Sequence, residues 1–341
     1  MGGGSNVLET EHLRITYDAS REVVTPLVSR LEATYEAVRR FCEASGLQPK
    51  PLTLRLEVLV FDRYENFAGH AQAAGVSGTS VAGFYDPESN STALCSVLDT
   101  PNLRRITQEI DRIRRQIAEL VPHESDSQTR AETRKSLEQI VSRLSAERDA
   151  LAERFNRLVI QHEVAHQVLY NLGVHVRGGS NPPWLLEGLA CQFEVLSSES
   201  SGGWMSGIND MRLADLREAF AVAPDAKGVS DGAYRKAFES GRLAPLVDLV
   251  SDPALLAKDD GNLAFRYAQS WALVHYLRHK HDRAFTTYLR IQSGGQPGVQ
   301  VPHEFDLDEF EAAFGEPDDS FQRRWLDYVL ALPFDPAKAG R

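Results

Sequence analysis

Hydrophobic and polar residues alternate with a period of two over residues 13–17 and 52–61 near the start of the chain, which predicts two β-strands. Two further candidate strands, residues 81–85 and 92–97, are separated by the turn DPESN. Helical spacing of the apolar residues over 23–41 and 63–74 predicts two helices between the strands. The chain therefore begins as an α+β part, which we place at residues 6–99.

A coiled-coil pattern follows over residues 100–155. Apolar residues recur at alternating intervals of four and three with polar residues between them, namely Ile106, Ile110, Ile113, Ile117 and Leu120. Because the polar stretch HESDSQ interrupts the pattern before it resumes, we expect an inserted antiparallel helical hairpin. Two interpretations stay open: a lid or dimerisation arm that would make the protein an oligomer, or a hairpin that packs on the body.

The remaining residues, 156–341, show helical patterns broken by Gly and Pro, so we expect a mainly helical part that carries the candidate site. Residues 1–5, MGGGS, are typical of a start codon followed by a flexible linker. A natural signal peptide would then have been trimmed away. The sequence is therefore compatible with a secreted or periplasmic location, and it leaves the compartment open.

Composition narrows the classes of function. The 341 residues are 42% hydrophobic and 25% charged, as in soluble globular proteins. No apolar stretch reaches the roughly 18 to 20 residues of a membrane helix, so we expect no membrane span. A net charge of −11 without Lys/Arg clusters argues against a nucleic-acid partner, because such binding depends on neutralising phosphates. Three scattered cysteines allow at most one disulfide.

The sequence HEVAH at residues 162–166 lies inside a continuous helical pattern. Residues four apart in a helix lie nearly above one another, so His162 and His166 point to one side, where a single zinc ion can bridge them. Glu163 is turned away from that line and is expected beside the open coordination position, where it can act as a base.

A catalytic zinc site needs a third protein ligand. Leu169 and Leu172 stand where a metzincin would carry glycine and its third histidine, so that class is excluded, and His175 is assigned to a loop. Glu187 interrupts an otherwise apolar helical face, and burying an unpaired carboxylate costs several kcal/mol, so metal ligation explains it. Glu194, seven residues later on the same face, is either a hydrogen-bond partner of a ligating histidine or a surface glutamate.

These residues carry a resemblance to the gluzincins of the peptidase MA clan, whose pattern is HExxH followed by a glutamate in a WLxEGxA context. The matching positions are His162, Glu163, His166, Trp184, Leu185, Glu187, Gly188 and Ala190. The layout also resembles bacterial members of that clan known as domains of unknown function, which carry a GFYDPxxN segment, here residues 83–90. The resemblance implies a zincin-like fold and one zinc ion per chain on His162, His166 and Glu187.

The resemblance also implies a reaction. Zinc-activated water would attack a peptide carbonyl, with Glu163 as general base and a peptide or protein as substrate. The clan's aminopeptidases carry a YxKGxALxxYL helix, and the similar YAQSWALVHYL begins at Tyr267. Tyr267 would then donate a hydrogen bond to the tetrahedral intermediate, or else be a core tyrosine. Weaker candidates for that donor are Tyr276, His275 and His303.

Two further expectations concern the class of activity. The GxMEN motif of aminopeptidases is absent, so endopeptidase action is favoured, with GFYDPESNSTALC as an edge strand that pairs with an extended substrate. The alternative is a metal-binding pseudoenzyme or protein-interaction module without peptidase activity. The intact Glu163 argues against that alternative.

Overall fold

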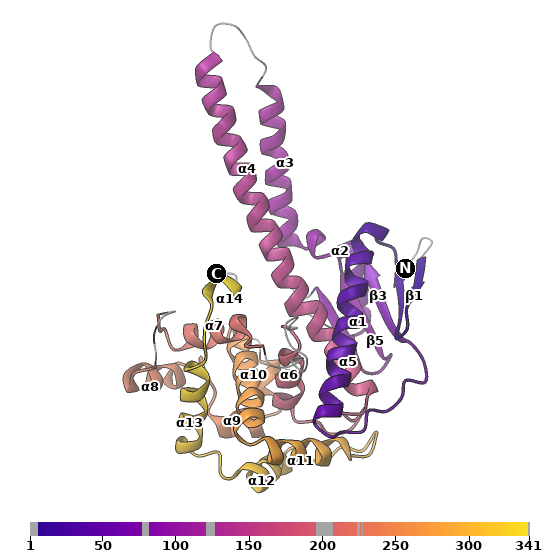
Figure 1. The fold of residues 1–341 in the computed structure, drawn as a ribbon, viewed down its shortest axis with the longest axis vertical. Coiled ribbons are helices and arrows are strands. Elements are labelled where there is room, and N and C mark those ends of the chain that lie inside the picture. Colours follow the sequence, from indigo (N-terminus) through magenta and orange to yellow (C-terminus); the bar gives the residue numbers. More distant parts are fainter. Residues whose placement is uncertain are drawn as a thin grey trace.

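The structure is a computed structural model that describes residues 6–76, 82–120, 127–195, 207–223, 226, 228–258 and 260–339. It confirms an α+β fold with a small mixed sheet near the N-terminus and a mainly helical remainder (Figure 1). The linker predicted at residues 1–5 lies outside the described residues. None of the helices in the described ranges is both long enough and apolar enough to span a membrane.

Five strands form the sheet, in the order β1-β2-β3-β5-β4. They are β1 (Asn6–Glu9), β2 (Leu13–Tyr17), β3 (Leu56–Phe61), β4 (Gly83–Asp86) and β5 (Ser91–Cys95). The three central strands are parallel, whereas β1 and β4 run antiparallel to their neighbours at the two edges. Since β4 is the last strand in this order, its outer edge is not paired with another strand of the described chain.

The predicted strands differ from the observed ones at their ends. β3 begins at Leu56 rather than residue 52, and Leu54 is 81% exposed, so the alternating pattern before Leu56 has no buried side. β5 stops at Cys95, where a short 3-10 helix, η1 (Val97–Asp99), takes over after one residue. Val81 lies outside the described residues. β1 was not predicted, because its side chains are largely exposed and it is held by backbone pairing with β2.

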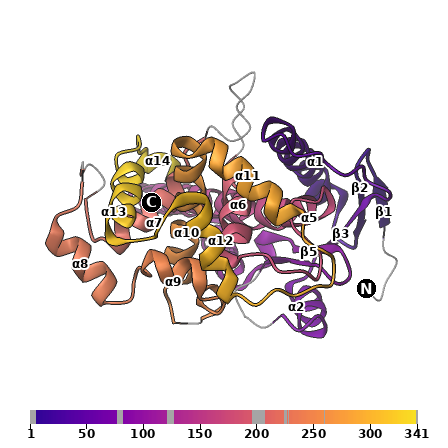
Figure 2. The ribbon, with the colours of Figure 1, turned by 90° about the horizontal axis from the view of Figure 1, so that it is seen from below.

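Helices cover both faces of the sheet. α1 (Arg21–Ala44) lies on one face together with the helix of the HEVAH motif, α5 (His162–Asn171), and α2 (Tyr64–Ala73) lies on the other (Figure 2). The face toward α1 and α5 buries Val58 and Val60. The side chains of Phe61 and Phe84 pack with those of α2.

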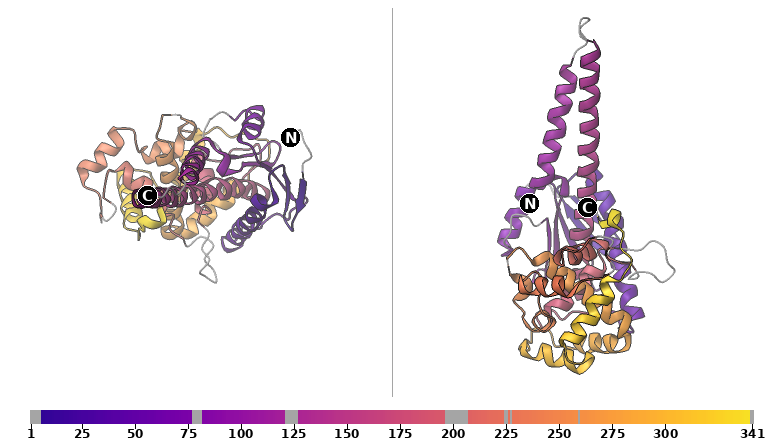
Figure 3. Two further views of the ribbon diagram at one scale, coloured as in Figure 1. Left: turned by 90° about the horizontal axis from the view of Figure 1, so that it is seen from above. Right: turned by 90° about the vertical axis from the view of Figure 1, so that its left-hand side faces the viewer.

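The coiled-coil segment forms an antiparallel pair, α3 (Pro101–Glu119) and α4 (Ser127–Phe155), which projects from the body (Figures 1 and 3). Ile110 and Ile113 are buried between the two helices, and the described part of the pair exposes no large apolar side chain. Only its base lies on the body, so the interpretation as a hairpin packed on the body fails for its outer length. A role as a lid or as a dimerisation arm stays a prediction.

α4 continues through a π-helical segment, η2 (Asn156–Gln161), directly into α5. The sequence pattern predicted an unbroken α-helix here. Arg30 of α1 donates hydrogen bonds to Glu153 and to Gln161, 3.1 Å long in both cases, and so ties this junction to the sheet side of the molecule. A π-helical turn of this kind often lies beside a functional site.

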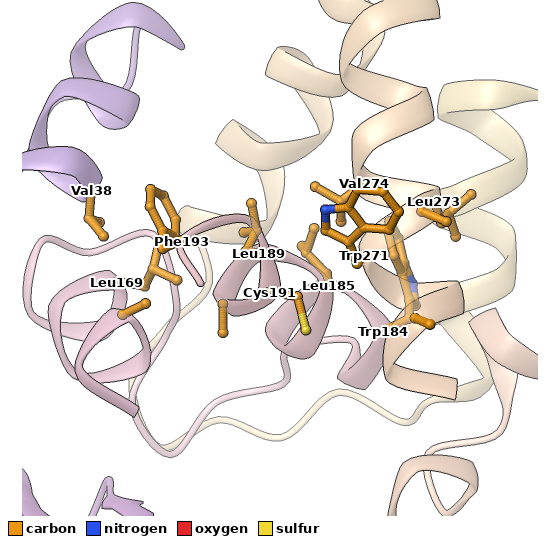
Figure 4. Close-up of a cluster of buried hydrophobic side chains, with 14 of the residues drawn as sticks. Val38, Leu169, Trp184, Leu185, Leu189, Cys191, Phe193, Trp271, Leu273 and Val274 are labelled. Carbon is orange, nitrogen blue, oxygen red and sulfur yellow. The ribbon is translucent and has the colours of Figure 1, made fainter. Parts of the chain in front are cut away.

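The remaining helices form the second half of the molecule. They are α6 (Pro183–Gln192), α7 (Asp210–Ala219), α8 (Asp231–Glu239), α9 (Leu246–Ser251), η3 (Leu255–Ala257), α10 (Leu263–Lys280), α11 (Asp282–Ser293), α12 (Glu304–Phe314), α13 (Asp319–Leu330) and α14 (Pro336–Ala339). α10 lies at their centre and packs on α6 through Leu185, Leu189, Trp271 and Val274 (Figure 4). This contact fixes the position of α6, which follows the HEVAH helix in the chain, relative to α10.

Candidate metal centre

α5 presents its two histidines on one side and its apolar residues on the other. Val164 and Val168 are fully buried in the main core, which fixes the rotation of the helix. His162 and His166 are one turn apart on the opposite side and are themselves buried. Packing of the apolar side therefore aims both imidazoles at the same point.

Three donor atoms converge at that point. The Nε2 atom of His162 lies 3.0 Å from the Nε2 of His166 and 3.0 Å from the Oε2 of Glu187, and the third separation, His166 Nε2 to Glu187 Oε2, is 3.5 Å. Zinc bonds of about 2.0–2.1 Å in tetrahedral geometry place neighbouring ligand atoms about 3.3 Å apart. The structure thus brings together the three residues predicted as ligands, with separations that suit one ion.

The chemistry of the donor set also suits a cation. The Nδ1 of His162 lies 3.0 Å from the buried Glu194 carboxylate, so this nitrogen carries the proton. A neutral His162 then turns a lone pair on Nε2 toward the Glu187 oxygen, and two acceptors at 3.0 Å repel unless a positive charge lies between them. A metal ion or a second proton on His162 removes that repulsion.

The pKa values are consistent with a site that attracts positive charge. Burial by itself lowers the pKa of His162, but Cys191, Glu187 and Glu194 together raise it well above the usual value. Burial raises the pKa of Glu187, and the two histidines more than reverse this, so the carboxylate stays ionised. The carboxylate is thus in the form that a divalent metal requires, and a bound metal would take the place of the second proton on His162.

A second group, His162, Cys191 and Glu194, also has atoms close enough to hold an ion. It uses the other nitrogen of His162, with the Cys191 sulfur 3.9 Å from Nδ1. Burial raises the pKa of the Cys191 thiol to about 11, so it stays protonated. The guanidinium of Arg212 already balances the charge of the Glu194 carboxylate, which disfavours a second cation beside it. We therefore assign these groups to the surroundings of the first site.

Glu194 was expected either beside a ligating histidine or on the surface, and the structure shows it beside His162 with no exposed surface. Its charge is balanced by Arg212, whose Nε donates a 2.9 Å hydrogen bond to Oε2. Burial raises the pKa of Glu194, but Arg212 and His162 lower it to about 2. Sequence patterns gave no sign of Arg212, because it lies on another helix.

Glu163 is half-buried and does not belong to the donor set. Its Oε2 accepts a 2.9 Å hydrogen bond from the backbone N–H of Tyr85 on β4. Burial raises the pKa of the Glu163 carboxyl, although His162 and His166 lower it. The carboxylate is thus fixed between the edge strand and the metal centre. Burial of this kind raises the pKa of a carboxylate, which makes it a stronger base.

Tyr267, near the start of α10, lies at the same centre. Its ring stacks on the His162 imidazole with 5.8 Å between centroids and 19° between planes. Its pKa is raised far above the usual value by the Glu187 charge and by burial, so the phenol remains a hydrogen-bond donor. The side chain is half-buried rather than enclosed, although it packs partly on the core.

The weaker candidates for a hydrogen-bond donor have other surroundings. Tyr276 packs on Phe321 and Tyr328, and His303 pairs with Asp306 at 2.8 Å. His275 is buried against Trp271, His279 and Tyr328. His175 packs on Tyr170 after the end of α5 and lies outside the donor set. The structure therefore brings only Tyr267 of the proposed donors to the centre.

Two glycines allow the elements to approach this closely. A Cβ atom on Gly188 would lie 2.5 Å from the Ser270 carbonyl oxygen, so the glycine after Glu187 lets α6 touch the backbone of α10. A Cβ atom on Gly83 would lie 2.7 Å from the Val159 side chain, so β4 can lie against η2. The glycines of the WLLEGLA and GFYD segments thus allow α6 and β4 to pack closely on two sides of the metal centre.

Asn90 fixes the turn after β4 to the end of α5. It adopts a left-handed backbone conformation with φ of 56°, which asparagine tolerates better than most residues. Its side chain exchanges hydrogen bonds with Asn171, 2.8 and 3.1 Å long, and accepts one of 2.9 Å from Arg177 and one of 3.1 Å from the Tyr85 hydroxyl. The GFYDPESN segment is therefore held against the helix of the metal centre.

One family model matches the part of the chain that carries this centre. The family described as "Protein of unknown function (DUF1570)" matches residues 158–298, and the chain is similar to it over this segment. The segment runs from η2 to the loop after α11, and it includes every donor of the metal centre as well as Glu163, Arg212 and Tyr267. No curated protein matches the chain.

Proposed function

We propose that the protein is a zinc-dependent peptidase of the gluzincin type with a zincin-like fold. The observation that carries this proposal is the convergence of His162, His166 and Glu187 on one point beside the half-buried carboxylate of Glu163. Three protein ligands with an adjacent carboxylate are the arrangement of catalytic rather than structural zinc sites, because a fourth position is left for water.

His162, His166 and Glu187 would hold the ion. When bound, zinc would lower the pKa of a water molecule toward about 7 and withdraw electrons from a carbonyl oxygen. Glu163 would take the proton of the attacking water and pass it to the leaving nitrogen. Its fixed position against the Tyr85 N–H limits the directions from which it accepts that proton.

The edge of β4 supports a peptide as substrate. The Cys95 N–H donates to the Ala82 carbonyl oxygen, so the alternation of an antiparallel pair turns the backbone groups of Gly83 and Tyr85 outward. One of these outward groups, the Tyr85 N–H, already reaches Glu163. An extended peptide paired with this edge would therefore run past the base, as in other cases of strand addition.

Tyr267 would supply the second electrophile. A phenol beside the metal centre can donate a hydrogen bond to the oxyanion that forms when the carbonyl is attacked. Its stacking on the His162 imidazole and its half-buried side chain support this role. Because β4 continues on both sides of Tyr85, the residue whose N–H reaches Glu163, we favour endopeptidase action.

The proposal is tested by metal analysis and by cleavage of a mixed peptide library with free and blocked ends. The protein should bind about one zinc ion per chain, and Glu163→Gln should keep the zinc but lose hydrolysis. Glu32→Gln is the matched control, since Glu32 is a half-buried, hydrogen-bonded glutamate on α1. Absence of zinc after purification in zinc-containing buffer would refute the site, and unchanged cleavage by Glu163→Gln would refute the base. Zinc binding without cleavage by the wild type would favour a pseudoenzyme.

A further inference from the structure

We propose that Arg212 is a positioning residue that holds the Glu194 carboxylate against His162 and, through the same guanidinium, holds Tyr267 in place. The effect on turnover rests on the proposed function, whereas the effect on His162 does not. Arg212 lies on α7, which contributes none of the three donor atoms, and its side chain is almost completely buried.

The Glu194 carboxylate receives hydrogen bonds on both oxygens. Oε1 faces His162 Nδ1 at 3.0 Å and accepts from Arg212 Nη2 at 2.5 Å. Oε2 accepts from Arg212 Nε at 2.9 Å and from Asn209 Nδ2 at 2.7 Å. A two-pronged arginine contact fixes the plane of a carboxylate as well as its place. The oxygen that faces His162 therefore cannot rotate away without breaking an arginine bond.

The start of α7 holds Arg212 in turn. Asn209 caps the helix, because its side-chain oxygen accepts from the Arg212 backbone N–H at 3.2 Å, while its amide nitrogen donates to Glu194. Asp215, one turn later, lies 3.9 Å from Arg212 Nη1 on the other end of the guanidinium. The cap and the ion pairs together leave the arginine one orientation.

The position of His162 depends on this arrangement. An imidazole that donates from Nδ1 to a fixed carboxylate is held in one tautomer and one ring orientation, with the lone pair of Nε2 directed away from that carboxylate. In this structure that direction leads to His166 and Glu187. Without Arg212, Glu194 would be a fully buried carboxylate without a balancing charge, which is strongly unfavourable.

Arg212 also touches Tyr267. Its Cζ atom lies 5.4 Å from the centroid of the Tyr267 ring, within the range of a cation–π contact. The His162 imidazole stacks on the same Tyr267 ring, with 5.8 Å between the ring centroids. One guanidinium thus restrains both a predicted ligand, through Glu194, and the predicted oxyanion donor directly.

The test compares Arg212→Met and Arg212→Lys with Arg217→Met. Arg217 is the matched control: it is a buried arginine on the same helix, and it donates hydrogen bonds to the carbonyl oxygens of Ala226 and Leu330. Zinc dissociation constants come from competition with a chromogenic chelator, and the visible spectrum of the cobalt-loaded protein reports ligand geometry. Arg212→Met should weaken zinc binding about 10- to 100-fold and change the cobalt spectrum.

Arg212→Lys should recover part of the affinity, because lysine restores the charge but not the two-pronged contact. Arg217→Met should lower the melting temperature while leaving the zinc affinity and the cobalt spectrum unchanged. Wild-type affinity and spectrum in Arg212→Met would overturn the proposal, and so would equal losses in both methionine variants. If Arg212→Met does not fold, Arg212→Lys decides, and wild-type values in that variant count against the proposal.

Two readouts separate this proposal from the proposed function. The Nδ1–H proton of His162 should give a low-field NMR resonance in the metal-free protein, and the loss of that resonance in His162→Gln would assign it. The resonance should shift or vanish in Arg212→Met but not in Arg217→Met. If the wild type binds zinc but cleaves no peptide, the proposed peptidase activity is refuted, whereas the effect of Arg212→Met on zinc affinity can still be measured. In an active protein, Arg212→Met should lower kcat more than it raises KM, because Tyr267 is also released.

Discussion

Substitution of Gly188 by alanine tests the close contact between α6 and α10 on which the centre depends. The added Cβ would lie 2.5 Å from the Ser270 carbonyl oxygen, 2.6 Å from the Val274 side chain and 2.9 Å from the Ser270 carbonyl carbon. Two of these three atoms belong to the backbone of α10, which cannot rotate aside as a flexible side chain can. The two helices must therefore move apart.

The size of the effect follows from the contact distances. Carbon–oxygen contacts in proteins lie at about 3.3–3.6 Å, so the helices should separate locally by about 1 Å. Overpacking of this kind costs about 1–3 kcal/mol, and the better helix propensity of alanine offsets about 0.5–1 kcal/mol of it. We expect a net loss of about 1–2 kcal/mol in the free energy of unfolding. A misplacement of about 1 Å between Tyr267 and Glu187 should also lower turnover about 100-fold.

Gly69→Ala is the control. Gly69 lies within α2, and a Cβ there would meet no atom within 4 Å, so the same change should stabilise the protein by about 0.5–1 kcal/mol. Unfolding by urea and peptide cleavage would be measured for both variants. If Gly188→Ala is as stable as Gly69→Ala and fully active, then α6 and α10 do not touch as described, and the placement of Tyr267 loses its support.

Three further outcomes are expected. Zinc at about 1000 times its dissociation constant should stabilise the wild type by about 4 kcal/mol, and the thermal shift should shrink in Glu187→Gln; an undiminished shift would remove Glu187 from the ligands. Tyr267→Phe should lower kcat about 100- to 1000-fold with little change in zinc affinity, and wild-type turnover would make Tyr267 a core residue. Burial lowers the pKa of His275 to about 3, whereas the unfolded chain binds this proton below about pH 6.5. The free energy of unfolding therefore falls as the pH drops from about 6.5 toward 3. Between pH 7.5 and pH 5, urea unfolding should show a loss of stability that is about 2 kcal/mol smaller in His275→Leu than in the wild type. Equal losses in both proteins would show that His275 titrates normally in the fold.

Much of the fold follows from local patterns. Alternation over short segments located the sheet, and the four-three spacing of isoleucines located the α3 and α4 pair. The pairing of β1 with β2 escaped prediction because it depends on backbone hydrogen bonds and places Val7 in solvent. The insertion of β5 between β3 and β4 also has no local signal, since strand order depends on which faces the helices cover.

The candidate site divides in the same way. His162, Glu163 and His166 share one helix, so their relative directions follow from 3.6 residues per turn. Glu187 is conspicuous in the sequence because a carboxylate among leucines must have a partner. Arg212 carries no such mark, since a charged residue on a helix is ordinarily solvated and only the packing of α7 shows that it is buried.

By itself, the sequence determined the helix that bears the two histidines and the glutamate that must join them. The segment GFYDPESNSTALC was predicted as an edge strand, and this is right only for Gly83–Asp86, because Ser91–Cys95 pairs with strands on both of its sides. Tertiary structure alone decided that the Tyr85 N–H meets Glu163, that Glu194 turns toward His162 and that α10 brings Tyr267 onto the same imidazole. The physical reason is distance along the chain. Helical and strand periods act over a few residues, whereas these contacts join separate elements, and only the joint burial of their apolar faces brings them within hydrogen-bond range.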